Sequence, residues 1–60
     1  MTQQYLTKQH SRFTAALAKG NQLIALDALW RAASYLNLLP EGQQEISSSE
    51  AHHYRSQLGW

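Results

Sequence analysis

The amino-acid sequence predicts a small all-α domain, an antiparallel helical hairpin followed by a short C-terminal helix. Residues 21–39 carry apolar side chains at helical spacing around most of the circumference, and an amphipathic stretch precedes them. The turn sequence Lys19-Gly20-Asn21 separates the two. We expect a single domain over residues 1–60, with helices at about 3–19, 22–38 and 48–57 and a loop at 39–47.

The first predicted helix has one apolar and one basic face. Four positions spaced i, i+4, i+7 and i+11 share the apolar face: Leu6, His10, Phe13 and Leu17. We expect this face to meet the core, with His10 as a hydrogen-bonded core histidine. The basic side chains lie opposite: Lys8, Arg12 and Lys19. Gly20 favours a helix end because it adopts positive φ freely, and Asn21 is expected to cap the next helix.

The central helix leaves only a narrow polar strip, Asp27, Arg31 and Ser34. A helix this apolar must be covered on several sides. We expect one stripe to meet the first helix: Leu23, Leu26, Trp30 and Ala33. Small residues on the remaining face would let another backbone come close, so a second chain is expected there, with this predicted protein interface: Ile24, Ala25, Ala28, Ala32, Tyr35 and Leu39.

The Asp27–Arg31 pair, spaced i, i+4, has two interpretations. It is either an exposed pair worth about 0.2–0.5 kcal/mol, or a pair at the rim of an interface whose register it fixes. Pro40 disfavours the helical conformation at the residue before it, so the helix should end near Leu38.

The C-terminal third is predicted to be a loop and a short helix. Residues 40–45 contain no large apolar side chain and should form a solvated loop. Ser47 and Glu50 have the spacing of a capping box, in which the Ser hydroxyl and the Glu carboxylate satisfy helix-terminal amides reciprocally. Ile46 is expected to pack against Ala51. So short a helix must dock or fray, because about ten residues cannot remain helical alone in water.

Length and composition indicate how the chain is stabilised. A 60-residue chain buries only about 60% of its unfolded surface. It has no cysteine, so disulfides and cysteine zinc sites are excluded. A homodimer or a larger protein partner is therefore expected. The sequence has no signal peptide and no apolar run long enough for a transmembrane span, so we expect a cytoplasmic protein.

No pattern in the sequence predicts catalysis, a cofactor or a metal. The serines lack a base spaced to activate them, and the three glycines are dispersed. Adjacent His52 and His53 lie about 100° apart on a helix, so both cannot face one ion. A metal site from His10, one of this pair and Glu50 is the weakest alternative that we weigh.

Two hypotheses of function remain. The first is a small non-enzymatic interaction or regulatory protein that acts through an apolar helical surface, as a homodimer or bound to a larger protein. The alternative is a small dimeric nucleic-acid-binding protein that uses Lys8, Arg12 and Lys19. Three phosphate contacts give a salt slope of only about −2.7, so this alternative needs dimerisation. Binding to a membrane surface fits less well, because the basic and apolar faces of the first helix are opposed.

Residues 26–36, Leu-Asp-Ala-Leu-Trp-Arg-Ala-Ala-Ser-Tyr-Leu, resemble a helix near the N-terminus of phosphoketolases, which reads approximately Trp-Arg-Ala-Ala-Asn-Tyr-Leu. Ser34 stands in place of the asparagine. The segments with which those longer enzymes bind thiamine diphosphate have no counterpart here. The resemblance therefore implies no activity or cofactor for this chain.

Overall fold

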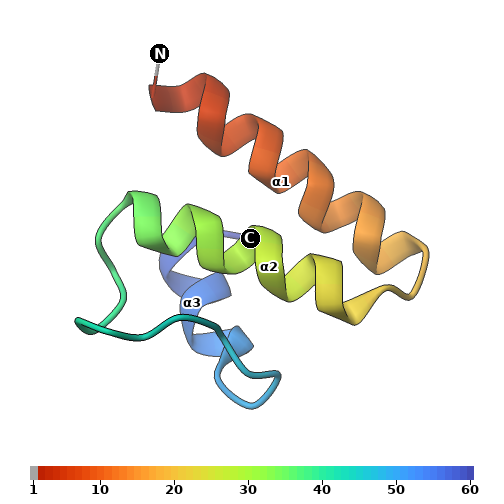
Figure 1. Ribbon diagram of the computed structural model, residues 1–60. Helices are drawn as coiled ribbons and strands as arrows, with labels where there is room; N and C mark the ends of the chain where they lie inside the picture. The colour runs from red at the N-terminus through yellow and green to blue at the C-terminus, as the bar shows by residue number, and fades with distance from the viewer. Residues whose placement is uncertain (1) are drawn as a thin grey trace.

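The computed structural model describes the backbone of residues 2–60 and the side chains of residues 4–60. It contains α1 (Thr2–Ala18), α2 (Gln22–Tyr35) and α3 (Ala51–Leu58). The first two helices form an antiparallel hairpin, and α3 with the segment before it lies on the other side of α2 (Figure 1). The predicted all-α fold class is confirmed. None of the helices described is long and apolar enough to cross a membrane.

All three helices end in the same way, on a residue with positive φ: Gly20 (73°), Asn37 (60°) and Gly59 (76°). In each case the next amide donates back to a carbonyl of the last helical turn. These bonds run from Asn21 to Ala16 (2.8 Å), from Leu38 to Ala33 (2.9 Å) and from Trp60 to Arg55 (2.9 Å). This is the Schellman motif, which satisfies the free carbonyls at a helix C-terminus.

The predicted start of α2 is confirmed, but its predicted end is not. Its start is confirmed, since Ile24 N–H donates to Asn21 Oδ1 at 3.2 Å. Its predicted end near Leu38 is wrong, because the helix ends at Tyr35. The left-handed conformation of Asn37, rather than Pro40, terminates it.

The seam between α1 and α2 includes a buried alanine of α2. Ala28 and Tyr35 are seven residues apart and so lie within about 20° of each other on the helix. The ring of Tyr35 lies 4.7 Å from that of Tyr5 in α1, so this face of α2 meets α1. Ala28 is fully buried there. We expected the small residues of this face to let the backbone of a second chain come close. The helix that packs there is instead α1 of the same chain.

The prediction that the stripe Leu23, Leu26, Trp30 and Ala33 meets the first helix is wrong for Leu23 and Trp30. Leu23 is 81% exposed. The indole N–H of Trp30 donates to the Gln43 carbonyl at 3.2 Å, so this side of α2 faces the segment between α2 and α3. Residues 40–45 of that segment are exposed except for half-buried Gln43, as predicted for a solvated loop, and Ile46 after them is a core residue with only 3% exposure.

The buried face of α1 is rotated from the predicted one. The residues that it buries follow the spacing i, i+4, i+7: Gln9, Phe13 and Ala16. Leu17 is 45% exposed, and His10 is exposed and stacks on the ring of Trp60 at 4.9 Å, so His10 is not a core histidine. A small side chain fits the close seam better than Leu17 does, so Ala16 lies inside. Buried Gln9 accepts a hydrogen bond from Arg12 Nη1 at 3.0 Å.

Helix α3 begins at Ala51, three residues later than predicted, after a turn at residues 48–50. Only half of the predicted capping box forms. Glu50 accepts a hydrogen bond from Ser47 N–H at 3.1 Å, whereas the Ser47 hydroxyl pairs with that of Ser49. The helix docks through buried Tyr54 and through Arg55, whose guanidinium lies 5.1 Å from the centre of the Phe13 ring.

Candidate interaction surface

The interface predicted from the sequence is divided by the fold. Ala25, Ala28 and Ala32 are at most 2% exposed, and their cover comes from the same chain. The predicted interface is therefore wrong at these three positions, because they belong to the core and cannot receive a second chain. Ile24 and Tyr35 remain 43% and 44% exposed, and Leu39 is half-buried.

An uncovered apolar region lies at the turn of the hairpin. The last turn of α1 and the first turns of α2 extend past α3 and the segment before it (Figure 1). We call the aliphatic residues there the turn-end surface: Leu17, Leu23, Ile24 and Leu26. Leu23 is 81% exposed, Leu17 and Ile24 more than 40%, and Leu26 is half-buried.

Two grooves adjoin this surface, and Leu26 lines both of them. The first, of about 190 Å³, has Leu23, Trp30 and Ile46 in its wall and Glu45 and Asp27 at its rim. We call it the acidic-rim groove.

The second groove is larger, about 440 Å³, and lies between the hairpin turn and α3. Phe13, Leu17 and Ala51 contribute apolar wall, and the rim carries His52 and Arg55. We call it the basic-rim groove. Arg55 is held in place, because it lies over Phe13 and its Nη2 donates to the Trp60 carbonyl at 3.1 Å.

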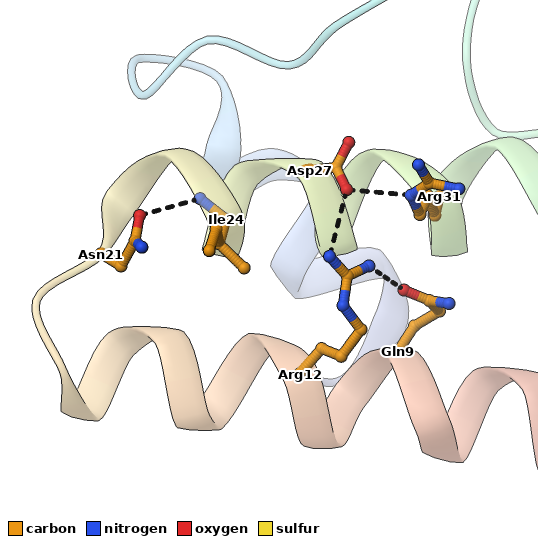
Figure 2. A network of polar contacts seen from close by, with 6 residues as sticks. All are labelled: Gln9, Arg12, Asn21, Ile24, Asp27 and Arg31. Atoms are coloured by element: carbon orange, nitrogen blue, oxygen red, sulfur yellow. Dashed lines mark hydrogen bonds and ion pairs between the residues drawn. The ribbon is translucent and has the colours of Figure 1, made fainter.

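A polar network joins α1 to α2 beside the turn-end surface (Figure 2). Asp27 Oδ2 accepts from Arg31 Nε at 2.9 Å and from Arg12 Nη2 at 3.4 Å. The hydrogen bond from Arg31 holds the pKa of Asp27 below its ordinary value, with the positive charges of Arg31 and Arg12 adding to it. Asp27 thus lies at the rim of an interface, but that interface is the one between α1 and α2.

The network changes the predicted basic stripe. Arg12 pairs with Asp27 instead of lying open with Lys8 and Lys19, both of which are exposed. The partner of Arg12 comes from α2, because the neighbouring helix brings Asp27 within reach.

The histidines do not form a metal centre among the residues that the structure describes. No group of three His, Asp or Glu side chains there has a metal-binding arrangement. His10 stacks on Trp60, His52 lies at the basic-rim groove and His53 shares a 2.9 Å hydrogen bond with Gln57.

Sequence reasoning missed Leu17, Leu23, Glu45 and Arg55 as candidate site residues. Leu17 and Leu23 were assigned to the core because they continue apolar stripes. Their nearness to Gly20 was the available signal, since side chains beside a tight turn lie at the edge of a hairpin.

Comparison of the chain with protein-family models, curated proteins and solved structures finds no match. The resemblance of residues 26–36 to a phosphoketolase helix stays confined to that segment. Ala28, Ala32 and Ala33 from it are core residues here, so it serves packing. The functional argument therefore depends on the geometry of this chain.

Proposed function

We propose that this chain is a small non-enzymatic interaction or regulatory protein that acts through its turn-end surface, as a homodimer or bound to a larger protein. The observation that carries the proposal is the 81% exposure of Leu23, which lines the acidic-rim groove. Leu23 contributes little to the fold, so its exposure has to be accounted for by something other than packing within the chain.

Physical chemistry favours a partner for this surface. Each Å² of apolar surface left in water forfeits about 25 cal/mol of stabilisation. Single exposed leucines are common on soluble proteins, but a cluster rimmed by polar groups marks an interaction site. Leu17 and Leu23 are both exposed beside the hairpin turn, and each of them lines one of the two polar-rimmed grooves there.

The nucleic-acid alternative loses support from the pairing of Arg12 with Asp27. Of the three cations predicted to contact nucleic acid, Lys8 and Lys19 take no part in an ion pair between described residues. Two phosphate contacts correspond to a salt slope of only about −1.8, which is too weak for useful affinity in one chain. We therefore rank protein interaction first.

The test is position-specific capture from native lysate. Immobilised parent protein is compared with Leu23→Gln and with Leu36→Gln, a matched control whose leucine is 43% exposed at the other end of α2. We expect the parent and the Leu36 variant to retain the same proteins and the Leu23 variant to lose them. Equal capture by all three would contradict the proposal.

Titration with duplex DNA distinguishes the nucleic-acid-binding alternative from the protein-interaction proposal. We expect no binding at physiological salt. Micromolar binding that weakens steeply with salt and disappears in Lys8→Gln with Lys19→Gln would favour a nucleic-acid-binding protein instead.

A further inference from the structure

We infer that the turn-end surface binds a second copy of this chain, in an isologous dimer that places the basic-rim groove of each copy against the acidic-rim groove of the other. This inference rests on the proposed interaction function and names its partner. Three features of the surface support it: the position of the grooves, the exposed leucine and the rim charges.

The position of the grooves suits a two-fold axis. Leu26 lines both of them, so they adjoin at that residue. A two-fold axis within the interface, running along their boundary, exchanges the two sides. Each copy then presents its acidic-rim groove to the basic-rim groove of the other, which is the self-complementarity that an isologous interface requires.

Leu23 supplies the apolar contact. It lines the acidic-rim groove and is 81% exposed, so most of its side chain stands clear of its own chain. Across the two-fold axis it meets the basic-rim groove of the other copy, whose wall contains Leu17 and Ala51. One exposed side chain thus contributes two symmetric contacts.

The rim charges are complementary in the same arrangement. Glu45 is an exposed carboxylate at the acidic rim, whereas Asp27 is already paired with two arginines. Arg55 is held by Phe13 and Trp60, and its guanidinium offers further N–H donors. The two-fold axis brings Glu45 of each copy to the side of Arg55 of the other. An arrangement that faced like groove to like groove would set these charges against their own sign.

The first experiment is sedimentation velocity of the full chain over roughly 1–500 µM, since the dimer fraction must rise with concentration. We expect the parent to approach twice its monomer mass. Leu23→Gln should raise the dimer Kd by about tenfold or more, because a buried leucine is lost at two contacts. Leu36→Gln is the matched control and should leave the Kd unchanged. Circular dichroism of each variant checks that the helices remain.

The second experiment tests the charges with two isosteric variants in the same segment. Glu45→Gln should weaken the dimer by about twofold to fivefold, in the range of an exposed ion pair, and should reduce its salt sensitivity. Glu41→Gln removes the same charge from an exposed residue that lines neither groove, and it should have no effect.

The outcomes separate this inference from the proposed function. A folded parent that stays monomeric throughout overturns the dimer, and if Leu23-dependent capture of another protein persists, the proposed function stands. Dimerisation that Leu23→Gln leaves intact places the interface elsewhere and overturns the inference. Equal effects of Glu45→Gln and Glu41→Gln overturn the pairing of the two grooves.

Discussion

Two parts of α2 have similar apolar content and opposite environments. In the first turn, Leu23 and Ile24 are 81% and 43% exposed. From the middle of the helix onward, Ala28, Leu29 and Ala33 are fully buried. The difference lies in their cover, because the segment after α2 folds back beside Trp30 and stops short of the hairpin turn (Figure 1).

This comparison separates what stabilises the fold from what is available for binding. The second half of α2 is held on one side by α1 and on the other by Ile46 and Tyr54. Leu23 in the first turn projects beyond that cover, so its side chain can change with little effect on stability. Paired substitutions in the two parts test this directly.

The largest expected effect is that of a buried charge. Ala28→Glu should destabilise the fold by about 3 kcal/mol or more, because the carboxylate enters a fully buried seam without a partner. Leu23→Glu makes the same charge change on the same helix and should cost less than about 0.5 kcal/mol in the monomer. Urea unfolding at low concentration measures both. Equal losses would remove the distinction between the two parts.

Deletion of a leucine side chain gives a milder version of the same comparison. Leu29→Ala should cost about 2–5 kcal/mol, since it opens a cavity at a fully buried position. Leu23→Ala deletes the same atoms from an exposed position and should change the free energy of unfolding by less than about 0.5 kcal/mol. Thermal unfolding of the two variants decides. A large cost at Leu23 would mean that the first turn supports the fold.

The segment that folds back over α2 is held in place by Glu50. Its carboxylate accepts hydrogen bonds from Ser47 N–H and from Gln43 Nε2, both at 3.1 Å. Glu50→Ala should cost about 1 kcal/mol and increase amide exchange in α3. Ser47→Ala should have little effect, because the Ser47 hydroxyl makes no bond to a helix amide. If Ser47→Ala increased amide exchange as much as Glu50→Ala, the Ser47 hydroxyl would also cap the helix, as the predicted complete capping box requires.

The smallest expected effect concerns Asp27, which lies between the two parts. Its pKa is lowered by Arg31 first, so its contribution to stability is present above its ordinary pKa and is lost as the pH falls through the lower folded value. Because the side chain is 43% exposed, the contribution is at most about 1 kcal/mol.

Asp27→Asn should therefore show less loss of stability than the parent as the pH falls below about 4. Chemical unfolding across that range measures the difference. Identical pH profiles for the parent and the variant would show that the network in Figure 2 contributes nothing to the fold.

The sequence by itself determined the elements and the hairpin. Local chemistry places the turn at Gly20, because a positive φ is needed there and glycine adopts it freely. Asn21 was also identifiable as a cap, because its side chain accepts a hydrogen bond from an amide of the helix that it begins. The antiparallel arrangement follows from so short a connection. Such signals act within a few residues and need no knowledge of the rest of the chain.

Only the tertiary structure decided which face of each helix is buried. Apolar periodicity identifies a set of positions, but α2 is apolar around most of its circumference, so periodicity does not select a direction. The choice depended on a close seam through Ala28, on the inward position of Ala16 in place of Leu17, and on how far the returning segment reaches. These are contacts between segments distant in sequence, and packing volume rather than hydrophobicity alone selects them.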